Sequence, residues 1–339
     1  MRPSISRISR NALQQASSRS YSTEPPKVRH LMTIGDLSPA ELSQLVLNAS
    51  SHKRAVKSGQ TPEAIKNKLL GQTVAMMFSK RSTRTRVSTE AAVALMGGHP
   101  MFLGKDDIQL GVNESLYDTS KIISSMTSCM VARVGPHDDV ANLAKHSSVP
   151  VINALSNDFH PLQTIADFLT IHEAFSQQKL NSTGVVPDRL RVAWVGDANN
   201  VLFDLAIGCV KLEKMATFIK EQAATSASPG TLSEYFVPEE AVKDADVIVT
   251  DTWVSMGQEE ETQKRLKAFS GFRVTDELAK RGGAKPDWKF MHCLPRHPEE
   301  VSDEVMYGPR SLVFQEGENR LWAAIAALQG FVIDKGHFA

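Results

Sequence analysis

Apolar positions in the first half of the chain alternate between helical spacing and short unbroken runs. Ser38 and Glu41 form a capping box ahead of Leu42, Leu45 and Val46, which recur at helical spacing. Short apolar runs predict strands over 73–78, 101–103, 129–134 and 149–153, and helices are predicted over 85–96, 116–125, 140–145 and 162–175. Strands that alternate with helices in this way predict a parallel sheet covered on both faces.

The same alternation restarts after a polar linker that contains proline and glycine, residues 177–188. Strands are predicted over 192–196, 247–250, 289–293 and 312–314, and helices over 201–212 and 319–330. The predicted fold class is therefore α/β, with two doubly wound parallel-sheet domains. Ligands of such domains bind at the C-terminal ends of the strands. The first domain spans 28–176, the second spans 189–318, and the helix and tail 319–339 are expected to pack back on the first domain.

The second domain is predicted to lack one edge strand. A doubly wound domain needs a second strand after its first helix, yet no run of about five strand-forming residues occurs between Leu212 and Val247. Apolar residues at helical spacing continue to Glu221 instead, and the polar segment 222–230 follows. Strand 192–196 would then be an uncovered edge, so a destabilised second domain with weak or absent activity is expected.

Composition and charge exclude several classes of protein. The 38 basic residues balance the 38 acidic ones, which gives no sign of binding to nucleic acid or a membrane surface. The longest stretch without a charged residue, 91–104, is shorter than the roughly 18 apolar residues of a membrane-spanning helix. Three cysteines without a CxxC pair exclude a disulfide framework and a cysteine-rich zinc site, and they fit a reducing compartment.

Residues 1–27 have the composition of a mitochondrial transit peptide followed by a disordered tail. The first 23 residues contain four arginines, many serines and no acidic residue. Segment 19–22 resembles a matrix-protease site, and cleavage after Tyr21 would leave 34 basic and 38 acidic residues, a net charge of −4. A disordered basic tail is the alternative, but the complete lack of acidic residues favours an address to the mitochondrial matrix.

A cluster of cations and hydroxyls follows the predicted strand 73–78. The octet 79–86 places Ser82, Thr83 and Thr85 among four basic residues where a helix begins. A helix N-terminus binds anions through its unpaired N–H groups, and basic side chains add charge-assisted hydrogen bonds. A solvated basic turn could account for any one of these residues, but the whole octet favours a phosphate site. It is not a Walker loop, since G-x-x-x-x-G-K-[ST] is absent.

Five motifs, in this order, resemble those of the aspartate/ornithine carbamoyltransferase family. Ser82 followed by Arg-Thr-Arg at 84–86 is similar to the family's phosphate motif, and His-Pro-Leu-Gln at 160–163, ahead of Ala-Asp at 166–167, is similar to its HPxQ-x-x-AD motif. Gly-Asp-Ala-Asn-Asn at 196–200 comes next. The segment 251–257 resembles the loop that recognises ornithine, and His-Cys-Leu-Pro-Arg at 292–296 matches the catalytic cysteine segment of ornithine enzymes. The resemblance covers nearly all of 31–331.

This resemblance implies an enzyme that transfers the carbamoyl group from carbamoyl phosphate to the δ-amine of L-ornithine, as in arginine biosynthesis or the urea cycle. It makes 28–176 the carbamoyl-phosphate-binding domain and 189–318 the ornithine-binding domain. The implied catalytic residues are Cys293, Asp251, Arg133 and His160. The implied contacts of carbamoyl phosphate are Ser82, Thr83, Arg84, Thr85, Gln109 from a neighbouring subunit, Arg133, His160, Gln163, Cys293, Leu294 and Arg320. The implied contacts of ornithine are Leu155, Asn200, Asp251, Ser255 and Met256.

The chemistry of two of these residues can be anticipated. Asp251 at a strand end can hold the cationic amine, and a thiolate of Cys293 beside it can exchange a proton with that amine. Nearby cations are expected to lower the pKa of Cys293. Cys293 is therefore interpreted as an acid/base and amine-positioning group and not as a nucleophile, whereas Cys129 and Cys209 are interpreted as small buried residues.

No metal or other cofactor is expected, because arginines and a helix N-terminus supply the positive charge. Segment 196–200 lacks the glycines of the nicotinamide-binding G-x-G-x-x-G. The expected partners are the two small-molecule substrates and, in a homotrimer formed through the first domain, copies of the same chain; no nucleic acid or membrane is expected. Aspartate, putrescine and acetylated ornithine are alternative acceptors, with putrescine the hardest to exclude. A non-catalytic isoform that binds carbamoyl phosphate or joins trimers is the alternative from another class.

Overall fold

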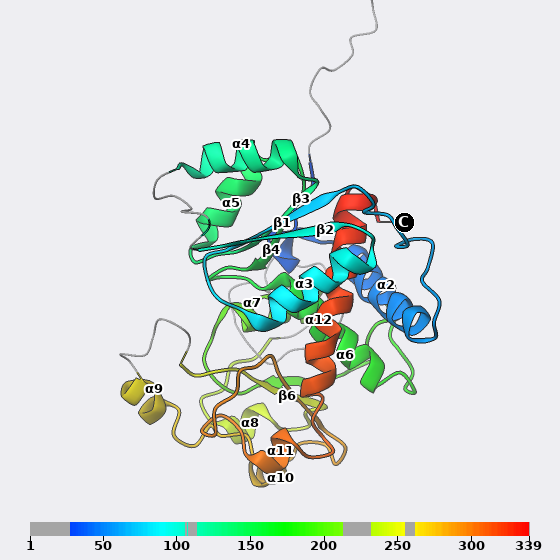
Figure 1. The fold of residues 1–339 in the computed structure, drawn as a ribbon. Helices are drawn as coiled ribbons and strands as arrows, with labels where there is room; N and C mark the ends of the chain where they lie inside the picture. The colour runs from blue at the N-terminus through cyan, green and yellow to red at the C-terminus, as the bar shows by residue number, and fades with distance from the viewer. Residues whose placement is uncertain (1–27, 106, 108–113, 213–231, 255–261, 339) are drawn as a thin grey trace, which may run out of the picture.

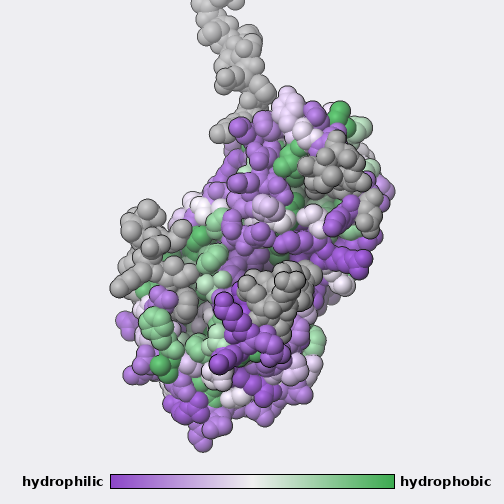
Figure 2. Space-filling model, turned by 90° about the vertical axis from the view of Figure 1, so that its left-hand side faces the viewer, coloured by the Kyte–Doolittle hydropathy of each residue, from purple (hydrophilic) through white to green (hydrophobic). Residues whose placement is uncertain are grey.

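Two parallel β-sheets, each flanked by helices, organise the chain in the computed structural model, which describes residues 28–105, 107, 114–212, 232–254 and 262–338. The first sheet lies in the upper part of Figure 1 and the second in the lower part. Figure 2 shows the same two lobes from the side, with hydrophilic residues over much of this face. The predicted class, two doubly wound α/β domains, is confirmed. Within the described ranges, no helix is both long enough and apolar enough to cross a membrane.

The first sheet contains four parallel strands in the order β2-β1-β3-β4. They are β1 (Thr73–Phe78), β2 (His99–Gly104), β3 (Cys129–Arg133) and β4 (Val151–Leu155). The central strands β1 and β3 are buried over nearly their whole length, which explains why they are unbroken apolar runs. One core cluster joins one face of the sheet to α4 (Leu116–Met126) and α5 (His137–His146), and another joins the opposite face to α2 (Pro39–Lys57), α3 (Thr83–Leu95) and α6 (Pro161–Ala174).

The second sheet contains three described strands in the order β5-β6-β7, all parallel. They are β5 (Val192–Trp194), β6 (Val247–Thr250) and β7 (Lys289–His292). In the described part of the chain β5 is an edge strand, as the sequence predicted. Helix α7 (Asn200–Lys211) follows β5, and the predicted helical continuation beyond Leu212 falls in 213–231, outside the described residues.

The C-terminal helix corrects one sequence prediction. The strand predicted over 312–314 is wrong: Ser311 forms a single β-bridge to β7, and helix α12 (Val313–Leu328) begins two residues later. Val313 and Glu316 are buried three residues apart while Phe314 is 66% exposed, so this segment already has the burial pattern of a helix. Helix α12 packs against α2, α3 and α6 of the first half and reaches β7 of the second (Figure 1). A short π-helical turn, η4 (Gln329–Ile333), follows it.

The strands predicted over 73–78 and 247–250 are present with the predicted ends, the remaining predicted elements have shifted ends, and four short helices in the second half were not predicted. The observed helix α5, for example, begins three residues before the predicted 140–145, because His137 and two following acidic residues form its first turn. The unpredicted helices are α8 (Pro238–Ala241), α9 (Thr262–Ala268), α10 (Asp276–Gly282) and α11 (Asp303–Met306). A 3-10 turn, η1 (Ile34–Asp36), precedes α2 and packs on α7.

Candidate active site

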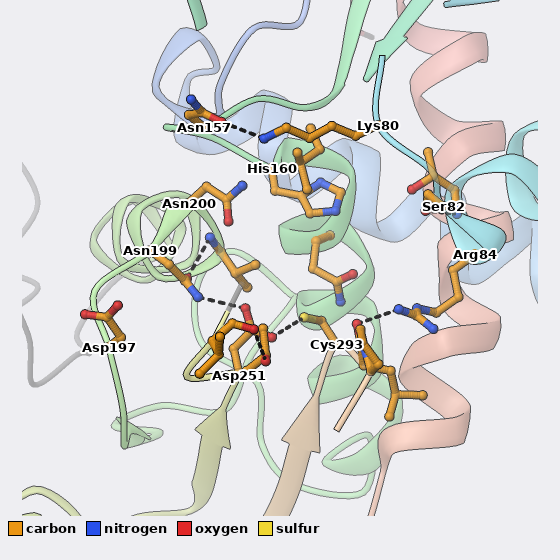
Figure 3. A pocket seen from close by; sticks show the side chains of 18 of the residues that line it. Lys80, Ser82, Arg84, Asn157, His160, Asp197, Asn199, Asn200, Asp251 and Cys293 are labelled. Carbon is orange, nitrogen blue, oxygen red and sulfur yellow. Dashed lines mark hydrogen bonds between the residues drawn. The ribbon is translucent and has the colours of Figure 1, made fainter. Parts of the chain in front are cut away.

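A cavity of about 1150 Å³ lies where the strand ends of the two halves face each other (Figure 3). Thirteen of the predicted site residues line it, and they come from both halves of the chain. They are Ser82, Thr83, Arg84, Thr85, Arg133, Leu155, His160, Gln163, Asn200, Asp251, Cys293, Leu294 and Arg320. Three further predicted residues, Gln109, Ser255 and Met256, lie outside the described residues.

The N-terminus of α3 forms one end of the cavity. The hydroxyl of Ser82, the N-cap, accepts a hydrogen bond of 3.2 Å from the backbone N–H of Thr85. The remaining N–H groups of the first helical turn have no partner within the helix, so they are available to an anion. Arg84 leaves the same turn and donates from Nη2 to the carbonyl of Leu294 at 2.5 Å, which connects this end to the segment after β7.

Three guanidinium groups converge on the cavity. Arg133 ends β3 and Arg320 lies on α12, and both are nearly fully buried. Burial, followed by repulsion from the other guanidinium groups, lowers the pKa of Arg133 to about 10, and burial also lowers the pKa of Arg320 to about 10, so both stay protonated at neutral pH. Among the described residues, no ion pair joins a carboxylate to Arg84, Arg133 or Arg320. Buried charge that is not directly paired is costly, so this end of the cavity favours an anionic ligand.

His160 and Gln163 lie beside these arginines at the start of α6. Arg320 Nη1 donates to Gln163 Oε1 at 2.6 Å and lies 3.3 Å from His160 Nε2. Burial and the neighbouring guanidinium charges hold the pKa of His160 well below its usual value, so the imidazole is neutral. Its Nδ1 is buried and makes no hydrogen bond within the described part of the protein. The neutral ring can therefore offer a hydrogen-bonding nitrogen to a polar ligand group.

The opposite wall of the cavity is acidic. Cys293 Sγ donates to Asp251 Oδ1 at 3.0 Å, and Asn199 Nδ2 donates to Asp251 Oδ2 at 2.7 Å (Figure 3). Burial, and then the negative charges of Asp251 and Glu316, raise the pKa of Cys293 well above its usual value. The expected lowering of this pKa by nearby cations is therefore wrong. Cys293 is a thiol that donates to a carboxylate, and a bound ammonium group would be the cation that this wall lacks.

A pair of buried carboxyl groups supports the cavity from behind. Gln163 Nε2 donates to Asp167 Oδ1 at 2.8 Å and to Glu316 Oε1 at 3.0 Å, and Glu316 Oε2 accepts from the backbone N–H of His292 at 2.8 Å. Burial raises the pKa of Asp167 to about 7, and burial and the charge of Asp167 raise the pKa of Glu316. Two such groups side by side cannot both ionise easily, so they retain a proton near neutral pH.

Asp251, His292 and Cys293 each bring a potential metal ligand within 4.8 Å of the others. The imidazole of His292 is already engaged at both nitrogens, since Nδ1 accepts from the N–H of Leu294 at 2.9 Å and Nε2 lies 3.1 Å from Glu300 Oε2. Binding an ion here would break one of these contacts. The donor set therefore does not form an open metal site.

Sequence reasoning missed three side chains that shape the cavity. Asn199 was noted only as part of segment 196–200, although it both caps α7 and holds Asp251. Its position before a helical run is an N-cap signal that could have identified it. Lys80 Nζ donates to Asn157 Oδ1 at 2.8 Å, and Lys80 belongs to the basic octet, whereas no sequence signal distinguishes Asn157 from other loop asparagines.

Two family models match the chain in succession. Residues 29–173 match the carbamoyl-phosphate-binding domain of aspartate/ornithine carbamoyltransferases, and residues 188–330 match the aspartate/ornithine-binding domain of the same family. Together they cover well over half of the chain.

Curated relatives and solved structures agree with these models. The mitochondrial ornithine carbamoyltransferase of Emericella nidulans is 63% identical, over 94% of this chain and 94% of its own. The ornithine carbamoyltransferase of Saccharomyces cerevisiae is 47% identical, over 93% of this chain and 97% of its own. The crystal structure of a mitochondrial ornithine carbamoyltransferase from Coccidioides immitis, 62% identical, superposes with a TM-score of 0.83 and covers 92% of this chain and 100% of the other.

The alignment with the Emericella nidulans relative also contains gaps on the side of this chain. The aligned stretch spans 339 positions, which is more than the 94% of this 339-residue chain that takes part in it. The relative therefore has aligned positions for which this chain has no counterpart.

Proposed function

This chain belongs to the aspartate/ornithine carbamoyltransferase family, and we propose that its cavity transfers the carbamoyl group from carbamoyl phosphate to the δ-amine of L-ornithine, forming L-citrulline and phosphate. The observation that carries this proposal is the polarity of the cavity. Buried guanidinium groups without carboxylate partners form one wall, and the Cys293–Asp251 pair forms the other. A dianion and an amine are the two reactants that such walls would hold in contact.

The cationic wall binds and activates carbamoyl phosphate. The N–H groups and hydroxyls of Ser82, Thr83 and Thr85 at the start of α3, with Arg84, hold the phosphate. Arg133, Arg320 and neutral His160 surround the carbamoyl group, where negative charge grows on the carbonyl oxygen as the amine attacks. Preorganised donors at such an oxygen contribute about 3 kcal/mol each to transition-state stabilisation. Gln163, Leu294 and Cys293 complete the carbamoyl-phosphate contacts.

The acidic wall prepares the amine. Ornithine enters with a δ-ammonium group, which pairs with Asp251 beside the Cys293 thiol. One proton passes from the ammonium to the Cys293–Asp251 pair and frees the nitrogen lone pair, which forms the C–N bond while the C–O bond to phosphate breaks. The phosphate leaves with the bonding electrons and takes up the second proton of the nitrogen. Leu155 and Asn200, with Ser255 and Met256 of the 251–257 loop, contact the rest of ornithine.

The pairing of β6 with β7 supports activity even without the strand that the sequence is predicted to lack. Thr250 and His292 are partners in register, and the next residues along each strand are Asp251 and Cys293. The reactive pair therefore depends on central strands that remain paired, and we expect an active enzyme instead of the weak or absent activity expected from the sequence alone.

A comparison of acceptors tests the proposal. The purified chain is given carbamoyl phosphate with ornithine, putrescine, N-acetylornithine or aspartate at equal concentration, and carbamoylated product is measured for each. Citrulline should be the dominant product, because Asp251 pairs with a cationic amine and repels an anionic acceptor. If carbamoyl-putrescine or carbamoyl-aspartate is the dominant product, putrescine or aspartate is the acceptor and not ornithine. Phosphate release without any carbamoylated acceptor would refute the transferase activity.

A homotrimer formed through the first domain is the quaternary state we propose, with Gln109 of one subunit reaching the cavity of the next. Exposed apolar side chains lie on both elements that flank the Gln109 segment. Met101 on β2 is 38% exposed, and Ile122 and Met126, four residues apart on α4, are 54% and 68% exposed. A trimer contact over β2 and α4 would bury these apolar side chains.

Sedimentation tests this assembly. The wild type should sediment as a trimer, and Ile122→Glu should dissociate it and reduce activity, because Gln109 is then withdrawn from the neighbouring cavity. The exposed, apolar Phe236 of the second domain offers a control, since Phe236→Glu should leave the trimer intact. A fully active wild-type monomer would contradict the placement of Gln109.

We also propose the mitochondrial matrix as the destination of the chain. The acid-free, arginine-rich segment before Glu24 supports this, and relatives described as mitochondrial share the family. Import into isolated mitochondria should shorten the chain near Tyr21 and protect it from external protease. A chain that stays full-length and protease-sensitive would contradict this destination.

A further inference from the structure

A buried carboxyl group on α7, in the second half of the chain, accepts hydrogen bonds from residues of the first half. Asp204 is fully buried, and its three hydrogen-bond donors all belong to the first half. Oδ1 accepts from Thr33 Oγ1 at 2.5 Å and from the N–H of Ile34 at 2.8 Å. Oδ2 accepts from the backbone N–H of His160 at 2.8 Å. The two oxygens therefore serve two different segments.

The face of α7 that carries Asp204 also holds the other end of the loop before His160. Asn200 lies four residues earlier, and therefore on the same face of the helix, and its Nδ2 donates to the carbonyl of Ser156 at 2.6 Å. The segment 156–160 is thus fixed at its first and last residues by one helix. This segment connects β4 to α6, and His160 is the residue on which α6 begins.

The backbone N–H of His160 has Asp204 as its described partner, whereas the His160 carbonyl accepts from the N–H groups of Gln163 at 3.0 Å and Thr164 at 3.3 Å in the first turn of α6. His160 is the N-cap of α6, yet its own side chain makes no capping hydrogen bond, and its N–H lies ahead of the helical hydrogen-bond ladder. Its imidazole must remain 3.3 Å from Arg320 and keep Nδ1 free for a ligand. A shift of the His160 backbone would move the ring directly, since only two side-chain torsions lie between them.

We propose that Asp204 is a positioning residue of the transfer reaction, holding the backbone of His160 so that the imidazole meets the carbamoyl carbonyl. The inference rests on the proposed function, because it assigns His160 to that carbonyl. It also makes α7 a direct connection between the two substrates, since the N-terminus of α7 lies at the ornithine side of the cavity and Asp204 lies one turn further along. A displacement of about 1 Å at a catalytic group reduces turnover by up to roughly 100-fold.

Because the two oxygens have separate donors, three variants can divide the positioning role from a purely structural one. Asp204→Asn keeps the shape but replaces one acceptor oxygen by an N–H2 group, so one donor set loses its partner. Thr33→Val removes a donor to Oδ1 together with the acceptor of the Gly35 N–H that caps η1, and it leaves the hydrogen bond from the His160 N–H in place. Asp36→Asn is the matched control: its Oδ2 accepts from the N–H groups of Met32 and Thr33 in the same N-terminal segment and has no hydrogen bond to His160.

Two readouts are measured for each variant: turnover of citrulline formation, and amide hydrogen exchange of the peptide that contains His160. Asp204→Asn should lower kcat by about 10- to 100-fold and speed exchange of the His160 amide, while titration with inorganic phosphate should give wild-type affinity. Thr33→Val and Asp36→Asn should lower the melting temperature and leave kcat and the exchange of that amide near wild type.

The proposal is overturned if Asp204→Asn keeps wild-type kcat, or if Thr33→Val and Asp36→Asn lower kcat as strongly as it does. If Asp204→Asn does not fold, Asp204→Ser replaces it with the same expectations, because a hydroxyl can accept from one donor without bringing an amide donor. A wild-type chain that forms no citrulline would instead refute the proposed function, so the two failures are distinguishable.

Discussion

Cys293 Sγ and Asp251 Oδ1 are 3.0 Å apart, although 42 residues separate them in the sequence. Each is the first residue after one of two neighbouring parallel strands, so strand pairing alone brings them to the same edge of the sheet. Burial keeps the sulfur protonated, and the carboxylate accepts its hydrogen bond. The pair therefore enters the reaction as a thiol and a carboxylate, and an incoming ammonium group adds a positive charge beside them.

Replacing the thiol tests its part in proton transfer. Cys293→Ser keeps a donor of similar size, but its hydroxyl does not ionise in the working range of pH. Turnover should fall by about 100-fold or more, which is the usual size of a proton-transfer contribution, and the pH profile of kcat should change. Steady-state kinetics between pH 6 and about 10 measure both, and wild-type affinity for inorganic phosphate, which is assigned to the N-terminus of α3, is the control. A wild-type rate and a wild-type pH profile would show that Cys293 contributes only packing.

Arg84 and Arg86 offer a matched pair for the anion site. Arg84 lines the cavity, whereas Arg86, two residues later, does not. Arg86 stacks on Phe102 and forms an ion pair of 2.9 Å with Glu90. Arg84→Ala should weaken carbamoyl phosphate binding by about 1.5–3 kcal/mol, the contribution of a charge-assisted hydrogen bond. Arg86→Ala should leave affinity unchanged. Calorimetric titration with carbamoyl phosphate compares them, and equal effects would remove Arg84 from the phosphate contacts.

The sequence predicted most of the fold because the strands of both sheets are buried between layers of helices. Such strands must be short apolar runs, and β6 was predicted with its observed ends. The failure at 312–314 has a physical cause: a three-residue apolar run is compatible with a strand or with the first turn of a buried helix, and only the burial of Glu316 decides.

The site was predictable as far as its motifs extend. Thirteen predicted residues line one cavity because motifs at strand ends of two facing sheets must converge. The protonation state of Cys293 was not predictable, since it depends on which charges lie nearest after folding. Asp204 was also missed, because an isolated acid in an apolar helix gives no indication of the backbone N–H groups that it will meet.

The buried carboxyl pair behind the cavity, Asp167 and Glu316, should make the free energy of unfolding depend on pH. The folded pKa of Asp167 is about 7, above the unfolded value of about 3.9, so the folded protein binds its proton more tightly. Stability from this group is present at low pH and is lost as the pH rises from about 4 to about 7. Asp167→Asn keeps an acceptor for Gln163 and offers a donor to Glu316.

Urea unfolding of wild type and Asp167→Asn across that range provides the measurement. The wild type should lose free energy of unfolding relative to the variant with rising pH, and the difference should level off above the folded pKa. A difference that stays constant with pH, or that changes in the opposite direction, would contradict the shared-proton account.

Strand β5, at the edge of the described second sheet, is expected to limit the stability of that sheet. Its backbone lacks a described neighbour on one side, and exposed strand edges are sites of pairing with other chains. Inserting a strand-forming segment between Leu212 and Glu213, to pair with β5, should raise the melting temperature and reduce aggregation. Differential scanning calorimetry and light scattering measure both. An unchanged melting temperature would show that the uncovered edge costs no stability.

The most direct test of the account is a single-turnover reaction of the wild-type protein with 14C-carbamoyl phosphate and excess ornithine, quenched over time and separated into protein, citrulline and phosphate. Direct transfer between the two walls of the cavity predicts that citrulline and phosphate appear together at the same rate, with no label on the protein. Phosphate that appears before citrulline, together with a carbamoyl group bound to Cys293, would contradict the assignment of that residue to proton transfer.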